Sequence, residues 1–100
     1  MSRPFSTESA FRASAHPLRR RIVDLLAQRS LTPSELIQSL GGTRPALSQH
    51  LRVLRETRII DVEQQGTSLV YRLNRPALRA VASWAARASA GPPSRRTAMA

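Results

Sequence analysis

Two closely spaced helix-start signals constrain the fold most, and they lie in LTPSELIQSLGGTRPALSQHLRVLRE, residues 31–56. Thr32 can cap a first helix, a proline suits its first position, and Glu35 completes a capping box. Gly41 can end that helix in a left-handed conformation. Thr43 then caps a second helix, which has a proline in its first turn. The stretch therefore predicts two short helices joined by a tight turn, the signature of a helix-turn-helix unit.

The segments on either side of this unit complete a small mixed fold. PLRRRIVDLLAQ, residues 17–28, has apolar residues at helical spacing, and STESAFRASA before it predicts a shorter helix. The short β-rich runs IIDVE and LVYRL are separated by QQGTS, in which Gly66 turns the chain. Asn74 can cap a last helix, PALRAVASWAARASA. The predicted fold is mainly α with a small β-hairpin (α+β), a winged helix-turn-helix.

Length and composition divide the chain into one domain with two short ends. One hundred residues are enough for one hydrophobic core and too few for two. We expect an N-terminal arm and short helix over 1–13 and the winged helix-turn-helix with its last helix over 14–90. The Pro, Gly and charge content of GPPSRRTAMA predicts a disordered tail over 91–100.

The charge balance predicts a polyanionic partner. Sixteen basic residues, all of them Arg, oppose six acidic ones and give a net charge of +10. This charge suits nucleic acid or an anionic membrane surface. The choice of Arg over Lys fits bidentate contacts to phosphate or guanine, and a GC-rich coding bias explains it equally well.

Other residue types exclude several classes of protein. The chain has no Cys, which excludes disulfides and thiolate metal sites. No apolar run approaches the roughly 20 residues of a membrane span, and the N-terminal stretch lacks a signal-peptide centre, so we expect a cytoplasmic protein. His16 and His50 are the two histidines and have no carboxylate cluster nearby, so the sequence predicts no metal site and no cofactor.

The second helix of the pair, residues 43–56, has one apolar and one polar side. Leu47, Leu51 and Leu54 share the sector that must face the core, with His50 at its edge. Arg, Gln and Ser, the types that bind base edges in the major groove, occupy the opposite sector. A solvated face that only confers solubility is the alternative, and the position of this helix in the predicted fold favours DNA.

These patterns give a set of expected contacts to double-stranded DNA. Base-edge contacts are expected from Arg44, Pro45, Ser48, Gln49 and Arg52. Contacts to the DNA backbone are expected from Thr32, Ser34, Thr43, His50, Arg55 and Arg58. The hairpin contributes a wing of Gln64, Gln65, Gly66, Thr67, Ser68 and Arg72, for which a plain hairpin tip is the alternative.

The last helix carries an apolar stripe that a chain this small has difficulty covering. Pairing of two chains through the first and last helices would bury the stripe, with Trp84 as an anchor. Packing of Trp84 onto its own domain is the alternative. The expected interface residues are Phe5, Phe11, Leu78, Val81, Trp84, Ala85 and Ala88.

Over residues 14–90 the sequence resembles the ArsR-type winged-helix transcriptional repressors. The segments RRRIVDLL, LTPSELIQSL, RPALSQHLRVLRE and VYRLN carry the resemblance by their order and spacing. Ser48 and His50 match the Ser-x-His motif of that family. The resemblance implies a homodimer with residues 43–56 as recognition helix and 59–73 as wing. Such a dimer would repress promoters by occupying an inverted repeat with half-sites about one helical turn apart.

Three departures from the family pattern change what the resemblance implies. Neither the Cys motif on the recognition helix nor the Asp and His ligands on the last helix is present, so metal sensing is not expected. Arg58 stands where Gly is common in the family. If this position keeps a left-handed conformation, Arg is strained there by about 1 kcal/mol. We hypothesise that a phosphate contact of Arg58 compensates for this strain. Thr67 and Ser68 stand where Arg is frequent, which predicts a weaker grip by the wing.

Two other classes of function fit the sequence less well. A winged-helix protein-interaction module with non-specific DNA affinity is the alternative to a sequence-specific regulator. An enzyme is not expected, because paired carboxylates, a Ser/His/Asp arrangement and a Gly-rich phosphate loop are all missing from the sequence. The expected partners are double-stranded DNA in the bacterial nucleoid and a second copy of the chain, with no membrane. A small-molecule or protein effector is left open.

Overall fold

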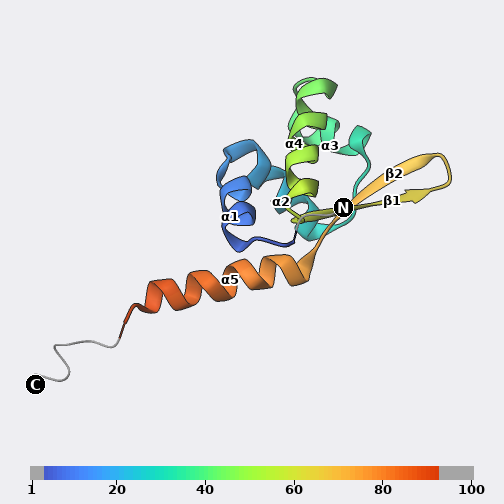
Figure 1. Ribbon diagram of the computed structural model, residues 1–100. Helices are drawn as coiled ribbons and strands as arrows, with labels where there is room; N and C mark the ends of the chain where they lie inside the picture. The colour runs from blue at the N-terminus through green and yellow to red at the C-terminus, as the bar shows by residue number, and fades with distance from the viewer. Residues whose placement is uncertain (1–3, 93–100) are drawn as a thin grey trace, which may run out of the picture.

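A computed structural model describes residues 4–92 and contains every predicted element. A four-helix body carries a projecting hairpin, and the last helix runs along one end of that body before extending away from it (Figure 1). Within the described residues the elements are α1 (Thr7–Ala15), α2 (Pro17–Gln28), α3 (Pro33–Leu40), α4 (Arg44–Glu56), β1 (Ile60–Gln65), β2 (Ser68–Leu73) and α5 (Arg75–Ala90). The predicted mainly α fold with a small β-hairpin is confirmed.

The core lies between the helices of the body and the base of the hairpin. Burial of the apolar side chains in this core is the main contribution to stability in a domain of this size. Leu31, just before α3, pairs with Tyr71 of β2 through backbone hydrogen bonds of 3.0 and 2.8 Å. This bridge fixes the start of α3 against the hairpin. The largest fully buried side chains are Ile22, Leu26, Leu36, Leu54, Ile59 and Ile60.

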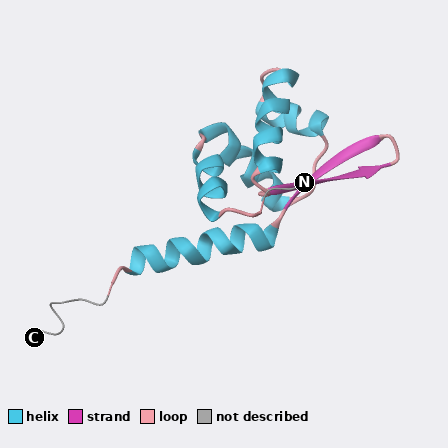
Figure 2. Cartoon of the chain, viewed as in Figure 1, coloured by secondary structure: helices cyan, strands magenta, loops and turns pink. Residues whose placement is uncertain are grey.

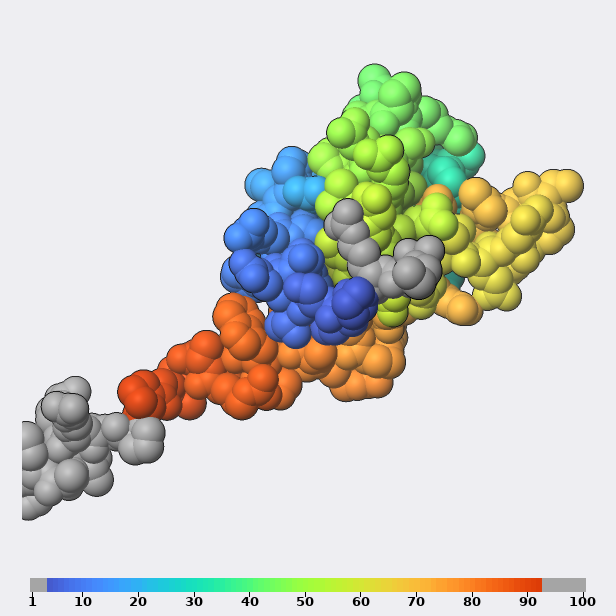
Figure 3. All heavy atoms as spheres, viewed as in Figure 1, coloured from blue at the N-terminus to red at the C-terminus, as the bar shows by residue number. Residues whose placement is uncertain are grey.

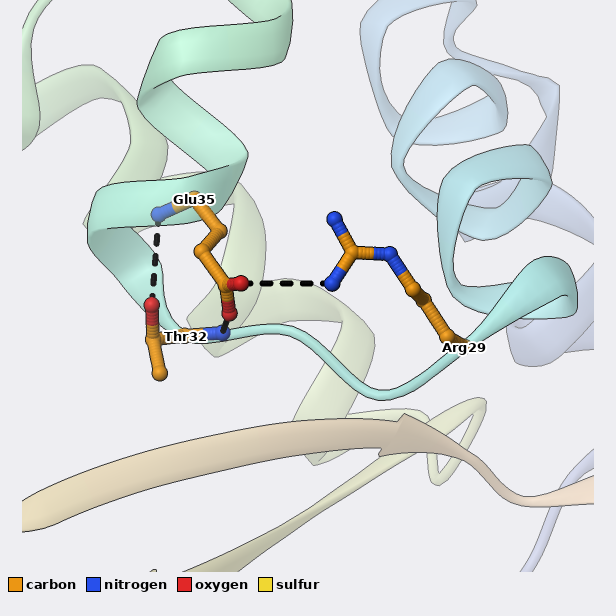
Figure 4. A network of polar contacts seen from close by, with 3 residues as sticks. All are labelled: Arg29, Thr32 and Glu35. Carbon is orange, nitrogen blue, oxygen red and sulfur yellow. Dashed lines mark hydrogen bonds and ion pairs between the residues drawn. The ribbon is translucent and has the colours of Figure 1, made fainter.

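The predicted capping box at the start of α3 is present (Figure 4). The Thr32 hydroxyl accepts a hydrogen bond of 3.2 Å from the Glu35 amide, and Glu35 Oε1 accepts one of 2.9 Å from the Thr32 amide. Arg29 adds an ion pair of 3.2 Å to the same carboxylate. Hydrogen bonds from the Thr32 backbone and from Arg29 lower the pKa of Glu35. The box satisfies amide donors that the first turn of a helix leaves open.

The turn between α3 and α4 is short and rich in glycine. Gly41 ends α3 at φ 75°, so φ is positive as predicted, while its ψ of −165° lies outside the left-handed helical region. Thr43 caps α4 through a hydrogen bond of 3.3 Å from the Ala46 amide. The helix-turn-helix predicted from the two start signals is therefore confirmed.

The hairpin is longer than the sequence pattern predicted (Figure 2). Predicted strands 59–63 and 69–73 become Ile60–Gln65 and Ser68–Leu73, antiparallel, with Gln65 opposite Ser68. Only Gly66 and Thr67 remain in the turn, and Gly66 has φ 62°. The polar residues near the tip pair through backbone groups alone, so their side chains gave no strand signal.

Two predicted boundaries also shift. Helix α1 runs to Ala15 and buries Ala10 and Ala13, so the expected boundary after residue 13 falls inside it. Helix α5 begins at Arg75, one residue earlier than predicted, because Asn74 caps it by accepting from the Ala77 amide. Most of the tail predicted to be disordered, residues 93–100, lies outside the described residues.

Candidate nucleic-acid interface

Helix α4 presents the polar side that the sequence predicted. Leu47, Leu51 and Leu54 are buried and hold the helix against the core. The six residues predicted for the opposite sector are all exposed along the helix: Arg44, Pro45, Ser48, Gln49, Arg52 and Arg55. Arg52 forms a long ion pair of 3.8 Å with Glu56, an exposed contact of little energetic weight. This face therefore keeps cationic and hydrogen-bonding groups available to a ligand.

A groove separates the first turns of α3 and α4 from the tip of the hairpin. Arg44 Nη2 donates a hydrogen bond of 2.7 Å to Ser34 Oγ, which ties the two helices together at the edge of this groove. The hairpin projects from the α3 side of the helical body, and its tip stands clear of that body (Figure 3). The groove has a volume of about 330 Å³, and its lining residues are Thr32, Pro33, Ser34, Arg44, Thr67, Ser68 and Leu69.

The fold thus brings together predicted residues from three separate segments. Thr32 and Ser34 come from α3, Arg44 from α4, and Thr67 and Ser68 from the hairpin. The hydroxyls of Thr32 and Thr43 already accept capping hydrogen bonds. Each hydroxyl also has a proton to donate, so capping leaves them able to bind a phosphate oxygen.

Arg72, the basic residue of the predicted wing, is engaged within the hairpin. Its Nη1 lies 2.7 Å from Glu63 Oε2 on the neighbouring strand. Gln64 donates a hydrogen bond of 3.3 Å to the Gly66 carbonyl at the tip. The described wing therefore presents amide and hydroxyl groups at its tip and has its positive charge neutralised near its middle.

Comparison with known proteins identifies the fold and its class. The model of the family "Bacterial regulatory protein, arsR family" matches residues 16–62, which span the helix-turn-helix and the start of the hairpin. The HTH-type transcriptional regulator Rv2034 of Mycobacterium tuberculosis is 41% identical over 81 residues, covering 81% of this chain and 76% of that protein. The chain belongs to the ArsR family of bacterial regulatory proteins. As a member it is a DNA-binding transcriptional regulator and not an enzyme.

Two further similarities agree with this assignment. The transcriptional repressor SdpR of Bacillus subtilis is 29% identical over 76 residues, covering 76% of this chain and 84% of that protein. An ArsR-like transcriptional regulator from Rhodococcus sp. RHA1 matches in structure with a TM-score of 0.76 at 25% identity, covering 84% of this chain and 79% of that one. The winged helix-turn-helix predicted from the sequence is thus confirmed.

His50 lies at the edge of the polar face of this ArsR-family protein and packs against the body. Its ring centroid is 4.7 Å from that of His16, which stands between α1 and α2. Burial, followed by the charges of His16 and Arg19, lowers the pKa of His50. The contact to the DNA backbone predicted for His50 stays a prediction.

Arg58 lies beyond the opposite end of α4 from Arg44, about 20 Å away along a helix of this length. Its φ is 63°, the left-handed conformation expected at this position. Its carbonyl accepts a hydrogen bond of 2.9 Å from Asn74, and it lines cavities of about 180 and 250 Å³ that share Phe5. The phosphate contact hypothesised for Arg58 stays a prediction at this distance from the groove.

The residues predicted for dimerisation lie along α1 and α5. Trp84 packs edge-on against Phe11 of the same chain, with ring centroids 5.1 Å apart, yet the two remain 40% and 45% exposed. Phe5 is half-buried against the core. Along α5, Leu78 and Val81 are half-buried, while Ala85 and Ala88 are exposed. Packing within the chain therefore covers only part of the predicted interface.

Sequence reasoning missed two contacts and one exposed residue at or near this site. The bond between Ser34 and Arg44 and the contact between the inclined rings of His16 and His50 join residues from separate segments, and no local pattern predicts such pairs. Leu69, 44% exposed beside the groove, was also missed. The alternation of the strand could have revealed it, because Leu69 lies on the same face as the buried Tyr71 and Leu73. Leu69 is nearer the tip of the hairpin, beyond the core, and so remains exposed.

Searches for two other kinds of site in residues 4–92 gave no candidate. No three His, Asp or Glu side chains there come together as metal ligands would. None of the helices in that part of the chain combines the length and the apolar character needed to cross a membrane.

Proposed function

We propose that this ArsR-family regulator is a homodimeric repressor that reads an inverted repeat through the exposed face of α4. One observation carries the proposal. The cationic and hydrogen-bonding residues of α4 lie exposed on one side of the helix. A groove lies between the first turn of this helix and the tip of the hairpin, and residues from both line it. An α-helix of this kind fits the major groove of B-DNA.

Each part of the surface has a proposed role in binding. Side chains on the exposed face of α4 contact base edges: Arg44, Pro45, Ser48, Gln49 and Arg52. Phosphate and sugar contacts come from Thr32, Ser34 and Thr43 at the starts of α3 and α4, and from Arg55 on the exposed face of α4. The backbone contacts predicted for His50, which packs against the body, and for Arg58, beyond the far end of α4, stay predictions outside this surface. The tip of the hairpin approaches the neighbouring backbone as a wing with Gln64, Gln65, Gly66, Thr67, Ser68 and Arg72.

Dimerisation supplies the symmetry that an inverted repeat requires. A second copy would cover the parts of Phe11 and Trp84 that stay exposed and continue along α5 to Ala88. Two α4 helices related by a two-fold axis would then enter successive major grooves, about one helical turn apart.

Repression and the lack of metal sensing rest on separate grounds. SdpR is named a transcriptional repressor, and the present chain resembles it along most of its length. A dimer seated on promoter DNA represses by excluding other proteins from that site. The sequence lacks Cys, and residues 4–92 hold no cluster of metal ligands, so we assign no metal to this regulator.

The test is selection of bound duplexes from a random pool at a stated salt concentration, with the mass of the free protein measured in parallel. We expect an enriched inverted repeat and the mass of a dimer. Binding that shows no enriched sequence and fades with salt would overturn the base-reading role and favour a protein-interaction module. A monomer that selects a single half-site would overturn the dimer.

Substitutions on α4 distinguish contacts to DNA bases from the effect of net charge on affinity. Replacing Gln49 or Arg52 by Ala is expected to cost about 1 to 3 kcal/mol on the selected duplex and to relax the enriched sequence. Arg79→Ala, on the exposed side of α5, removes the same charge as Arg52→Ala and serves as its control. Equal losses on selected and random DNA would exclude a base contact for the residue tested.

A further inference from the structure

The two histidines of this chain meet at the contact between α4 and the rest of the domain. His16 stands at the junction of α1 and α2, and His50 lies in the middle of α4. Their ring centroids are 4.7 Å apart with the planes inclined at 48°, and both rings are half-buried. This pair therefore joins the junction to the helix whose other side is proposed to read DNA.

His16 makes a second contact that requires an unprotonated nitrogen. Its Nδ1 accepts a hydrogen bond of 3.1 Å from the Leu18 amide and so caps α2. An imidazole that accepts at Nδ1 holds its single proton at Nε2 and is neutral. This cap ties the His16 ring to the start of α2, so the pair is anchored on that side.

The charged neighbours of His50 that shift its pKa are both basic. Burial has the largest effect on the pKa of His50 and lowers it, and the charges of His16 and Arg19 lower it further. Arg19 lies in the first turn of α2, and its buried Nε has no hydrogen-bond partner. A second positive charge at this contact would therefore meet repulsion.

The acidic residues of the elements packed against α4 are either paired with other residues or exposed. Glu8 of α1 is paired with Arg12 at 2.9 Å, and Glu35 of α3 is held by Arg29 and Thr32. Asp24 of α2 lines a cavity between α2 and α3. On β1, Asp61 is exposed.

The remaining acid of β1 is also held away from the pair. Glu63 of β1 is bound to Arg72 on the neighbouring strand. No carboxylate is among the groups that shift the pKa of His50.

We propose that the contact between His16 and His50 is a pH-sensitive switch of the DNA-binding domain. With the His50 ring neutral, the contact holds α4 against the junction of α1 and α2. Acidification protonates His50 beside His16 and Arg19, and the contact then opens and loosens α4. The effect on DNA rests on the function proposed above, whereas the effect on the free protein does not.

The sign of the pH effect follows from proton binding. Because the pKa of His50 is lower in the folded chain than in the unfolded one, the unfolded chain binds protons more readily. The contribution of neutral His50 to folding stability is therefore fully present above the ordinary histidine pKa of about 6.5. It is lost as the pH falls from there through the lowered pKa of His50.

Proton NMR of the DNA-free protein tests directly whether His16 lowers the pKa of His50, since a chain with two histidines gives ring signals that can be assigned by removing one of them. His16→Asn removes the charge and keeps a side chain that caps helices well. We expect the titration midpoint of His50 to lie below the ordinary value and to rise in His16→Asn. A midpoint that is the same in both proteins would overturn the proposal.

Melting temperatures between about pH 7.5 and 5.5 test the consequence for stability. One pKa unit of coupling corresponds to a loss of about 5 to 11 °C in a domain of this size. We expect the wild-type protein to show such a loss. A variant with His16→Asn and His50→Phe keeps a cap and a ring without titrating, and its loss should be much smaller. Equal losses in the two proteins would overturn the switch.

Binding to the selected duplex at constant salt tests the regulatory effect. We expect affinity to fall about tenfold per pKa unit of coupling as the pH drops, and to change little in the double variant. Binding that tightens in acid, as a phosphate at the pair would produce, would overturn the switch. NMR and melting use the free protein, so they decide the switch even where no duplex is selected.

Discussion

Ser34 of α3 accepts a hydrogen bond of 2.7 Å from Arg44, the first residue of α4. The bond spans the turn of the helix-turn-helix and fixes the direction of an exposed guanidinium. Because a flexible Arg loses rotamer freedom on binding, a bond that orients it beforehand lowers that loss. We therefore expect Ser34 to act on DNA binding partly through Arg44.

This arrangement predicts a coupling between the two residues. Arg44→Ala is expected to weaken binding to the selected duplex by about 1 to 3 kcal/mol, and Ser34→Ala by about 1 kcal/mol. Adding Ser34→Ala to Arg44→Ala should have a smaller effect than Ser34→Ala has on the wild-type protein, and a double-mutant cycle on binding free energies measures the difference. Ser39→Ala, at an exposed serine of the same helix, is the control. A full effect of Ser34→Ala in both backgrounds would show that Ser34 acts independently.

The capping box at α3 predicts a specific acid sensitivity. Hydrogen bonds from Thr32 and Arg29 lower the pKa of Glu35 in the folded chain. Its carboxylate therefore stabilises the fold fully above the ordinary value of 4.5, and this contribution is lost as the pH falls through the lowered pKa. Glu35→Gln keeps a capping-box residue without the charge. We expect the melting temperature of Glu35→Gln to fall less than that of the wild-type protein below about pH 5; parallel curves would contradict this.

The local signals in the sequence predicted most of the backbone. The capping box at Thr32 and the polar face of α4 each depend on residues within a few positions of one another. The left-handed conformation at Arg58 was expected only from the family resemblance, in which Gly is common at this position. The lengthened hairpin was missed because Gln64 and Gln65 pair through backbone groups that every residue carries. Strand extension of this kind leaves no mark in the side-chain pattern.

The contacts that define the site depend on tertiary placement, and for this reason the sequence did not predict them. Ser34 and Arg44 meet because the turn folds α4 back against α3, and His16 meets His50 across 34 positions of sequence. Arg72 was expected in the DNA-facing wing. The register of the hairpin sets it opposite Asp61, and its ion pair is with Glu63, which lies diagonal to it on β1. Such pairs appear only once the elements have been packed.

The backbone at Arg58 predicts a difference between two small substitutions. At φ 63° a side chain with a Cβ is strained, and glycine is not. Arg58→Ala and Arg58→Gly both remove the guanidinium, so their comparison isolates the backbone. We expect Arg58→Gly to be more stable by about 1 kcal/mol in chemical denaturation. A more stable Arg58→Ala would show that the junction between α4 and β1 relaxes to another conformation.

The exposed part of Trp84 predicts that its removal weakens the proposed dimer. A buried Trp anchor contributes about 2 kcal/mol or more, so Trp84→Ala should raise the dissociation constant of the dimer about 30-fold or more. Sedimentation of a dilution series measures this constant. Leu69→Ala removes another large exposed apolar side chain, at the tip of the hairpin, and should leave the constant unchanged. Equal effects of the two variants would place the interface elsewhere.

The ion pair within the hairpin predicts a gain of DNA affinity when it is broken. Glu63→Gln releases Arg72, which can then reach a phosphate, so binding should tighten on every duplex and the salt slope should steepen by about 1. Stability should change by less than about 1 kcal/mol, because both partners are about half exposed. Asp24→Asn makes the same change of net charge far from the wing and is the matched control in the salt titration. If both variants tighten binding equally, net charge is the cause, and Arg72 has no contact of its own with DNA.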